Sequence, residues 1–444
     1  MERLEKGITR RTFLGRAASA VAGVTVGTTA LSYGRILGAN DRVSLGIIGM
    51  GRRGGGHIEI LSQIKDSQNV EVTAVCDLWK PYREKAAAAV QKGHGRVPRT
   101  FEHLEDLLAL KDVDGVTIAT PEHQHAVQTK MAAEAGKHIY VEKSMANVLE
   151  EAKAARDAVL ARPNLIVQVG TQHRSEPYPI AARNLIKTGV LGELNQIEVA
   201  WNYNMPRWRG RKEVKLTNAE DIDWQKFLLT KPHRPFDPQL YWEYRLYRDF
   251  SSGIPDGLWS HAIDLIHFFM DDYFPRAVVA HGGVFAWHDG RENPDTIHAL
   301  LEYPKGFLVN ISTGFGNDSP SFTRYMGKNG TLINIGGEGS PRYQLIEEKG
   351  NHEEDPDIYS KRASRYVTPP GSDALPPTFI DDNVPYHMNS WLDGMRSGKQ
   401  PSAPIQAGYA HSVACMMTDV AYRHGKRVYW DAKNELIVDQ PPAS

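Results

Sequence analysis

A lysine and a histidine are the side chains of this sequence best suited to move a proton. Lys143 ends the apolar segment KHIYVEK, and His261 begins the amphipathic segment HAIDLIHFF. If burial and a neighbouring positive charge lower the pKa of Lys143, its amine can polarise or deprotonate an alcohol. His261 is a suitable proton acceptor, and Asp264, on the same helical face, is predicted to orient it. Taken singly, a solvated lysine and a core histidine remain alternatives.

A glycine-rich loop precedes both residues in the chain. Gly49, Gly51 and Gly54 form a G-x-G-x-x-G directly after the apolar run Val43–Ile48. In a dinucleotide site the first glycine permits a tight turn, the second admits the pyrophosphate, and the third lets the next helix pack on the strand. The helix N-terminus then attracts the phosphates. The spacing therefore predicts a dinucleotide site, with a purely structural turn as the alternative.

An acidic residue ends the next predicted strand, Val70–Asp77. The carboxylate of Asp77 is predicted to accept hydrogen bonds from the adenosine ribose and to repel a 2'-phosphate, which favours NAD over NADP. Arg52 and Arg53 belong to the predicted cofactor site and, with Lys80, weaken this preference. A strand-end cap is the alternative role for Asp77.

Two more segments place polar residues at the carboxyl ends of predicted strands, where open α/β sheets bind ligands. The remaining predicted cofactor contacts in these segments are Thr120, Pro121, His123, His125, Glu142 and Lys143. The pair His123 and His125 also suggests a metal, but no third ligand has suitable spacing, so no metal site is predicted. A capping or lining role for His123 remains open.

The elements that must position these residues alternate between strand and helix. Predicted strands cover 43–48, 70–77, 115–120, 137–143 and 164–170, with an amphipathic segment at 122–136. This alternation predicts a doubly wound parallel sheet, a Rossmann domain over residues 41–170.

Beyond residue 170 the pattern changes to that of an α+β domain over 171–444. A helix at 178–189 precedes alternating runs at 276–286, 297–303, 307–315 and 331–335, which predict a large, mostly antiparallel sheet. Residues 349–384 are predicted to form a long loop. Helices within 385–424 are predicted to pack back on the Rossmann domain.

The bulk properties exclude some classes of protein. The chain has 444 residues, a formal net charge of -1 and two cysteines, which are interpreted as small core residues with one bridge possible. This composition does not predict binding to nucleic acid or to a membrane surface. The segment TRRTFLG, with Arg10 and Arg11 before a weakly apolar stretch, predicts a twin-arginine signal within residues 1–40 and hence a periplasmic protein. A basic amphipathic helix on the folded domain is the alternative.

The order of GMGRRG, CD, TPEHQH, EKS, GTQHR and SHAID along one chain resembles the Gfo/Idh/MocA family of NAD(P)-dependent oxidoreductases. The resemblance extends from about Val43 to Trp430. It implies a Rossmann domain followed by a domain whose sheet covers the nicotinamide. It also implies that Lys143 and His261 stand at the family's two catalytic positions, and that the protein is a homo-oligomer, a dimer or a tetramer.

Two positions depart from the family pattern. Ser144 replaces the proline of the E-K-P motif, which removes a backbone restraint. Gly257 replaces the aspartate four residues before the histidine, and Asp256 lies one place away. The usual trio of lysine, aspartate and histidine is therefore incomplete, which places the proton transfer in question.

The resemblance also implies a carbohydrate substrate. The predicted substrate contacts are Gln172, His173, Arg174, Tyr203, Trp259 and Asp264. Trp201, Trp208, Trp242 and Trp259 suit sugar stacking, with ordinary packing as the alternative.

We expect an exported carbohydrate oxidoreductase with a tightly bound, recycled NAD, because free NAD is scarce outside the cytoplasm. One alternative is a redox-neutral NAD-dependent glycosidase. Such an enzyme oxidises a ring hydroxyl, eliminates the aglycone, adds water, and reduces the ketone again with the NADH it formed. A second alternative is a sugar- or nucleotide-binding protein without catalysis.

Overall fold

The computed structural model describes residues 42–337, 341–348, 364–370 and 385–442. The twin-arginine segment at Arg10 and Arg11 lies outside them, so its assignment remains a prediction. Within the described ranges no helix has both the length and the apolar character needed to cross a bilayer. Cys76 and Cys415 are both buried and both free, so no disulfide joins them.

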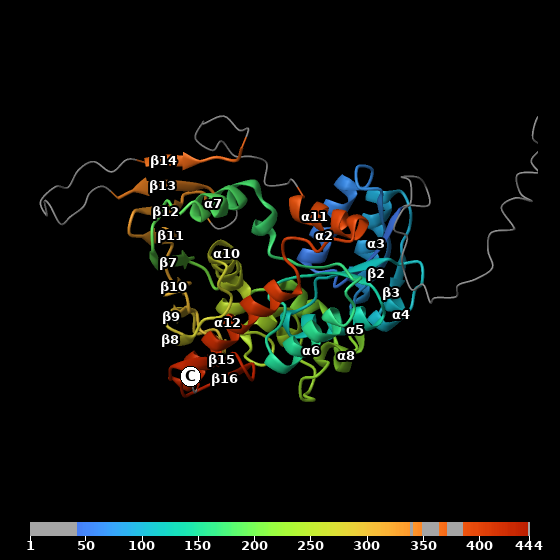
Figure 1. The fold of residues 1–444 in the computed structure, drawn as a ribbon. Coiled ribbons are helices and arrows are strands. Elements are labelled where there is room, and N and C mark those ends of the chain that lie inside the picture. The colour runs from blue at the N-terminus through green and yellow to red at the C-terminus, as the bar shows by residue number, and fades with distance from the viewer. Residues whose placement is uncertain (1–41, 338–340, 349–363, 371–384, 443–444) are drawn as a thin grey trace, which may run out of the picture. The chain divides into compact units, whose positions relative to one another are not determined.

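The first sheet of the described chain has six parallel strands in the order β3-β2-β1-β4-β5-β6 (Figure 1). The strands are β1 (Val43–Ile48), β2 (Val70–Cys76), β3 (Arg99–Phe101), β4 (Gly115–Ile118), β5 (His138–Val141) and β6 (Val167–Val169). Apart from the short edge strand β3 they are largely buried, as expected when helices cover both faces of a parallel sheet. The predicted Rossmann topology is confirmed.

Helices connect these strands and cover the sheet. They are α2 (Arg52–Ile64), α3 (Lys80–His94), α4 (Leu104–Leu108), α5 (Glu122–Glu134) and α6 (Leu149–Leu160). A short 3-10 helix, η2 (Gln172–Ser175), and α7 (Pro177–Lys187) follow β6. Strand order reverses between β1 and β4, and the crevice at such a switch point is where doubly wound sheets bind ligands.

The register of the first sheet sets which residues meet at that crevice. Ile48 of β1 pairs with Cys76 of β2 on one side and with Ile118 of β4 on the other. Ile118 pairs in turn with Val141 of β5. The segments that follow these four residues, which carry the glycine loop, Asp77, Thr120 and Lys143, therefore share one edge of the sheet.

The second sheet contains ten strands of the described chain in the order β14-β13-β12-β11-β7-β10-β9-β8-β15-β16. Only the β7–β10 pair among them is parallel, so the prediction of a mostly antiparallel sheet is confirmed. The strands are β7 (Leu194–Asn202), β8 (Ala277–Gly283), β9 (Thr296–Glu302), β10 (Leu308–Gly314), β11 (Phe322–Gly327), β12 (Gly330–Asn334), β13 (Tyr343–Glu347), β14 (Ser364–Val367), β15 (Val428–Asp431) and β16 (Leu436–Val438). The prediction of a continuous loop over 349–384 is wrong, because β14 lies within it and pairs with β13.

Helices between the two sheets complete the fold (Figure 1). A one-turn π-helix, η6 (Pro255–Trp259), leads directly into α10 (Ser260–Met270), and α10 packs against α12 (Ile405–His424). α12 also contacts β8 of the second sheet and α6 of the first domain. Trp391 of α11 (Tyr386–Ser397) is buried in the core of the first domain, and its indole N–H donates to Ile166 O at 3.3 Å. Both C-terminal helices thus contact the Rossmann domain.

Candidate active site

The glycine loop has the geometry that a dinucleotide requires. Gly49 has a φ of +87°, and a Cβ on Gly54 would lie 1.9 Å from Gly49 O, so the turn and the helix packing both require glycine. A Cβ on Gly51 would meet nothing within 4 Å. Gly51 therefore borders open space at the N-terminus of α2, where backbone N–H groups attract phosphate. The loop fits the pyrophosphate of a dinucleotide.

Asp77 joins the glycine loop to the end of β2. Its Oδ2 accepts from Met50 N at 2.6 Å and its Oδ1 accepts from Trp79 N at 2.8 Å. Burial raises the pKa of Asp77 to about 6, against the opposing effect of these two N–H donors. The capping role that the sequence left open is therefore present. Each oxygen keeps a second lone pair for a ribose hydroxyl.

Glu142 connects the start of α2 to the end of β5. The carboxylate is buried, and its Oε1 accepts from Arg53 Nε at 2.5 Å and lies 3.0 Å from His57 Nε2. Burial opposes ionisation, but Arg53 and His57 together hold the pKa of Glu142 well below its usual range. Arg53 and Glu142 thus form an ion pair that fixes the residue preceding Lys143.

Lys143 lies at the carboxyl end of β5, as predicted, and its amine contacts the second domain. Its Nζ donates to the backbone O of Gly257 at 2.6 Å. Burial lowers the pKa of Lys143 to about 8, and the Arg245 cation adds to this against the opposing carboxylates Glu122 and Glu142. The amine therefore titrates close to neutral pH, as a general acid or base requires.

Gly257 contributes a carbonyl where the family pattern has a carboxylate. A Cβ on Gly257 would lie 2.7 Å from Cζ2 of Trp208, so the indole fills the space that a side chain at 257 would occupy. In place of an aspartate side chain at this position, the backbone O of Gly257 accepts the hydrogen bond from Lys143.

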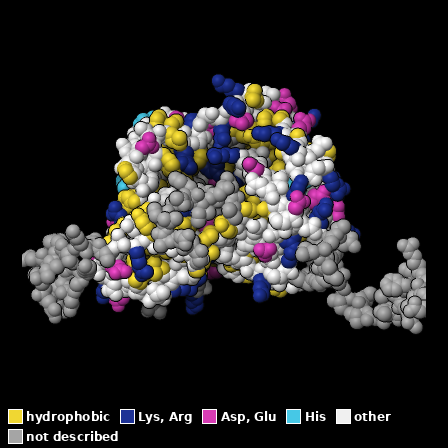
Figure 2. All heavy atoms as spheres, turned by 90° about the horizontal axis from the view of Figure 1, so that it is seen from above, with side chains coloured by type: hydrophobic (Ala, Val, Ile, Leu, Met, Phe, Trp, Pro, Cys, Tyr) yellow, Lys and Arg dark blue, Asp and Glu magenta, His cyan; other side chains and the backbone are white. Residues whose placement is uncertain are grey.

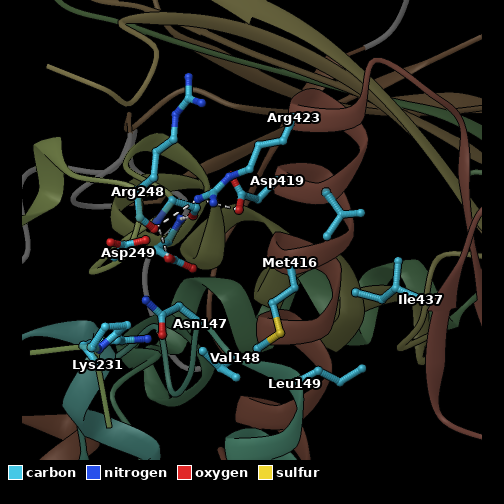
Figure 3. Close-up of a pocket in the computed structure, with 14 residues that line it drawn as sticks. Asn147, Val148, Leu149, Lys231, Arg248, Asp249, Met416, Asp419, Arg423 and Ile437 are labelled. Atoms are coloured by element: carbon cyan, nitrogen blue, oxygen red, sulfur yellow. Dashed lines mark hydrogen bonds and ion pairs between the residues drawn. The ribbon is translucent and has the colours of Figure 1, made fainter. Parts of the chain in front are cut away.

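Asp256 does not replace the missing carboxylate. Its Oδ2 accepts from Ser252 N at 2.8 Å, and the residue lines a separate cavity of about 380 Å³. That cavity also presents Lys231, Asp419 and Arg423 (Figure 3). The trio of lysine, aspartate and histidine is therefore incomplete in the structure as well as in the sequence.

The buried Asp256 makes stability depend on pH. Burial raises the pKa of Asp256 from 3.8 to about 7, so the folded state holds a proton that the unfolded state has lost between these values. Stability therefore falls as pH rises through this window and stays low above it. We expect Asp256→Asn to flatten the fall and to raise the unfolding free energy at pH 8 by up to about 4 kcal/mol. Urea unfolding of the full chain at pH 5 and pH 8 tests this, and an unchanged pH dependence would contradict it.

His261 is the second residue of α10, about one turn after Gly257. Its ring centroid lies 5.8 Å from that of His173. Burial, followed by the charges of Lys143 and His173, lowers the pKa of His261 well below its usual range. The ring is therefore neutral, and its Nδ1 has no hydrogen-bond partner among the described residues. His261 is suited to hydrogen-bond a substrate hydroxyl, whereas Lys143 is the group that titrates.

The prediction that Asp264 orients His261 is wrong. Asp264 is buried, and its Oδ2 accepts from Arg174 Nε at 2.7 Å, while its Oδ1 lies 3.5 Å from His411 Nδ1. Burial opposes ionisation, but Arg174 and His411 hold the pKa of Asp264 well below its usual range. Arg174 and Asp264 were also expected to contact substrate. Instead they form a buried ion pair that joins η2 to α10.

The two histidines of the TPEHQH segment support the fold. His123 is buried, its Nε2 lies 2.8 Å from Phe227 O, and burial lowers its pKa to about 3. His125 is buried between Ser144 O, 2.7 Å from Nδ1, and Thr120 O, 2.8 Å from Nε2. Both rings are buried beside backbone carbonyl groups, so neither presents an exposed edge for the predicted cofactor contact. His125 holds together the two loops that follow β4 and β5.

The remaining predicted contacts are divided between core and surface. Trp259 is fully buried, and its indole N–H donates to Thr313 Oγ1 at 2.8 Å, so it cannot stack on a sugar. Trp201 is buried as well. The half-buried residues of the predicted set are Thr120, Pro121, Gln172, His173 and Tyr203, and Arg52 is exposed.

One ion pair near Lys143 was not predicted. Glu122, the first residue of α5, is buried, and its Oε1 accepts from Arg245 Nε at 2.6 Å. Both residues contribute to the pKa of Lys143. Glu122 stands within the segment TPEHQH, but nothing in its spacing indicates a partner 123 positions away.

Two family models match the chain. The model described as "Oxidoreductase family, NAD-binding Rossmann fold" matches residues 43–171, and the model of the same family described as "Oxidoreductase family, C-terminal alpha/beta domain" matches residues 227–426. Together these ranges contain the glycine loop, Lys143, Gly257 and His261.

Curated relatives resemble about half of the chain. A "Glycosyl hydrolase family 109 protein" from Shewanella baltica (strain OS185) is 29% identical over 245 residues, which are 50% of this chain and 51% of the relative. A "Glycosyl hydrolase family 109 protein 2" from Shewanella sp. (strain ANA-3) is 30% identical over 255 residues, 53% of each chain. The chain thus spans about half the length of the curated relatives it matches.

Solved structures share the fold over most of the chain. A levoglucosan dehydrogenase in complex with NADH has a TM-score of 0.66 and 18% identity, covering 88% of this chain and 99% of that chain. The WlbA dehydrogenase from Bordetella pertussis, in complex with NADH and UDP-GlcNAcA, has a TM-score of 0.61 and 18% identity, covering 90% and 100%. At this identity the likeness concerns the fold alone.

Proposed function

Because this chain belongs to the Gfo/Idh/MocA oxidoreductase family, we propose that it is an NAD-dependent oxidoreductase acting on a ring hydroxyl of a carbohydrate. The single observation that carries the proposal is the amine of Lys143, which is held at the carboxyl end of β5 with a pKa lowered to about 8. NAD, when bound, supplies the hydride acceptor.

The chain's own residues would bind the cofactor at the switch point of the sheet. Gly49, Gly51 and Gly54 admit the pyrophosphate, and Asp77 accepts hydrogen bonds from the ribose hydroxyls. The carboxylate of Asp77 supports NAD over NADP, because a 2'-phosphate would place a second negative charge beside it.

Two side chains would handle the substrate hydroxyl. The neutral amine of Lys143 accepts the hydroxyl proton when the alcohol is oxidised, and the ammonium returns it when the ketone is reduced. The neutral ring of His261 holds the hydroxyl by a hydrogen bond and does not need to change its charge. A lysine and a histidine thus suffice for proton transfer in the absence of a carboxylate at Gly257.

We also propose that the protein is exported and keeps its nucleotide through each catalytic cycle, as a homo-oligomer. The twin-arginine segment at Arg10 and Arg11 supports export. A cofactor that stays bound removes the need for free NAD, provided that a second carbonyl compound takes the hydride back.

Nucleotide release is the first test of this proposal. After extensive dialysis, acid treatment of the purified protein is expected to release NAD or NADH in a stoichiometric amount. The dialysed protein is then titrated with a panel of sugars and polyols, and the absorbance band of reduced nicotinamide is expected to appear. A protein that is empty and binds NAD weakly, or that leaves bound NAD oxidised with every sugar, would contradict the proposal.

A redox-neutral glycosidase is a second candidate, favoured by the resemblance to the glycosyl hydrolase family 109 proteins. Its net reaction is hydrolysis, and Lys143, His261 and Tyr203 are the candidate acids and bases. Release of the aglycone from an aryl glycoside by the NAD-loaded protein would support it. If no aryl glycoside is cleaved, the oxidoreductase remains.

A further inference from the structure

Arg207 is a half-buried cation for which the residues that the structure describes provide no counter-charge. Its guanidinium carbon lies 4.2 Å from the centre of the Tyr203 ring and 5.9 Å from that of Trp208. No carboxylate or carbonyl within the described ranges pairs with this guanidinium. A guanidinium that lies over an aromatic ring and pairs with no carboxylate of the described chain keeps its N–H donors available, which indicates a place for an anion.

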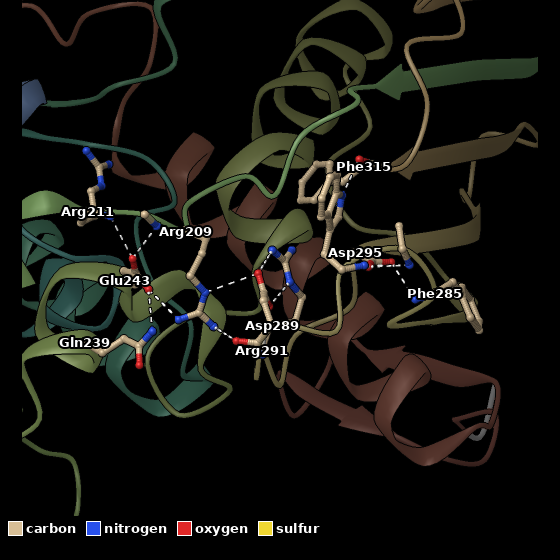
Figure 4. Close-up of polar contacts among 12 residues, drawn as sticks. Arg209, Arg211, Gln239, Glu243, Phe285, Asp289, Arg291, Asp295 and Phe315 are labelled. Carbon is tan, nitrogen blue, oxygen red and sulfur yellow. Dashed lines mark hydrogen bonds and ion pairs between the residues drawn. The ribbon is translucent and has the colours of Figure 1, made fainter.

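The residues that follow Arg207 in the chain, Arg209 to Arg211, are anchored by hydrogen bonds and ion pairs (Figure 4). Arg209 Nη1 pairs with the buried Glu243 at 2.6 Å, and Arg209 Nη2 donates to Asp289 O at 2.6 Å. Gly210 N and Arg211 N donate to the same carboxylate, at 2.7 and 3.0 Å. These contacts anchor the backbone next to Arg207, which reduces the entropic cost of ordering the loop when a ligand binds.

The same loop holds Trp208 in an unusual conformation. Trp208 has a φ of +69°, which is costly for a large side chain. Its ring packs edge to face on Phe315, with centroids 5.4 Å apart, and Phe315 O accepts from the indole N–H of Trp287 at 2.7 Å. Strain that the surrounding contacts maintain in this way is typical of functional loops.

Arg207 is linked through two intervening residues to Lys143, whose amine is the proposed proton carrier. Arg207 lies over Trp208, the Trp208 ring fills the space beside Gly257, and Gly257 O accepts from Lys143 Nζ. A ligand whose hydroxyl reaches Lys143 would thus have its far end near Arg207.

The surroundings of Arg207 are positive. Burial, then the neighbouring cations Arg245 and Arg52, lower the pKa of Arg207, and no carboxylate offsets them. Figure 2 shows one face of the molecule on which Lys and Arg side chains gather around a hollow. Positive charge on a concave surface raises the local concentration of anions.

We propose that Arg207 binds an anionic group of the substrate, so that the preferred carbohydrate carries a carboxylate or a phosphate. This inference rests on the proposed function, because it names the class of sugar that the same site accepts. Tyr203 and Trp208 flank the guanidinium and contact the apolar face of the sugar ring. The pyrophosphate of NAD is the competing source of negative charge, and the experiment separates the two.

The test compares D-glucose, D-glucuronate and D-glucose 6-phosphate as substrates and as ligands. KM is measured from the absorbance of reduced nicotinamide, and Kd is measured by calorimetry on the NAD-loaded protein. The variants are Arg207→Gln and Arg207→Lys. Arg324→Gln is the matched control, because Arg324 also lies over an aromatic ring, Phe322 at 4.4 Å, but pairs with Glu198.

We expect one of the two anionic sugars to bind the wild type more tightly than D-glucose. Arg207→Gln is expected to weaken the binding of that sugar by about 10- to 100-fold, as for loss of a charge-assisted hydrogen bond. The affinities for D-glucose and for NAD are expected to stay nearly unchanged. Arg207→Lys is expected to restore part of the loss, and Arg324→Gln to have no effect.

Three outcomes separate the inference from the proposed function. If neutral and anionic sugars bind alike and Arg207→Gln changes neither, the inference fails while turnover of sugars still supports the proposed function. If Arg207→Gln lowers the affinity for NAD instead, Arg207 binds the pyrophosphate of the cofactor and the inference fails. If no sugar reduces the cofactor, the proposed function fails, and the calorimetric preference for an anionic sugar still decides the inference.

Discussion

A Lys143→Ala variant is expected to keep its bound nucleotide and to lose about 10³-fold in kcat, the typical effect of removing a general acid or base. Lys143 Nζ contacts Gly257 O and not the glycine loop, so the affinity for NAD is expected to change little. The measurements are the amount of nucleotide released by acid and the rate of single-turnover reduction of the bound cofactor. Lys130→Ala is the control, because Lys130 is solvent-accessible on α5 and pairs with Glu134.

The pH profile identifies the role of the amine. With a pKa of about 8, neutral Lys143 becomes the major form above that pH, so alcohol oxidation is expected to be half-maximal near pH 8 and to level off at roughly one to two pH units above it. Ketone reduction needs the ammonium and is expected to fall over the same range. The Lys143→Ala variant is expected to lose both dependences. If its kcat matched the wild type, Lys143 would not be the proton carrier.

Alanine at Gly54 and at Gly51 is expected to affect different properties. Gly54→Ala places a Cβ 1.9 Å from Gly49 O, so the helix must move and the protein is expected to lose about 3 kcal/mol of stability together with NAD binding. Gly51 has an ordinary extended conformation, φ -64° and ψ -168°, with open space beyond it. Gly51→Ala is therefore expected to change the stability of the nucleotide-free protein by no more than about 0.5 kcal/mol relative to the wild type. It is expected to lower the affinity for NAD by at least about tenfold.

Thermal unfolding and calorimetric titration of NAD, both on nucleotide-free protein, distinguish the two variants. Each variant is the control for the other, because both add one methyl group to the same loop. If Gly51→Ala binds NAD as tightly as the wild type, the pyrophosphate does not lie against Gly51. An undisturbed melting temperature in Gly54→Ala would mean that α2 adjusts to the added methyl group at no cost.

Local sequence patterns predicted the features that depend on neighbours in the chain. The glycine loop, Asp77 and Lys143 were located because apolar strands end just before or at them, and parallel strands end at one edge of the sheet. The helical periodicity around His261 predicted α10. In each case a short segment is enough to define the geometry.

Sequence patterns could not supply the partners of buried charges. Asp264 shares a helical face with His261, but its ion pair is with Arg174, 90 positions earlier. Glu122 and Arg245 also form an ion pair, and because 123 positions separate them, nothing in the sequence around either residue indicates the other. Periodicity shows which face of an element is buried, and says nothing about which distant side chain meets it.

Edge strands and aromatic residues were also difficult to predict. The strand β14 lies in a polar, proline-rich stretch and is extended because it pairs with β13. Trp259 and Trp208 look alike in the sequence, yet one is core and the other borders Gly257. Burial of an aromatic side chain depends on tertiary packing, which composition does not encode.

The indole of Trp208 beside Gly257 makes substitutions at these two positions depend on each other. An aspartate introduced at 257 would place its Cβ 2.7 Å from Trp208, and a smaller residue at 208 alone leaves an empty space beside a glycine. Each single step is therefore unfavourable although the double change restores a filled site, which is sign epistasis. Directed evolution that randomises position 257 alone will recover glycine, and libraries must vary 208 and 257 together to reach the family's carboxylate.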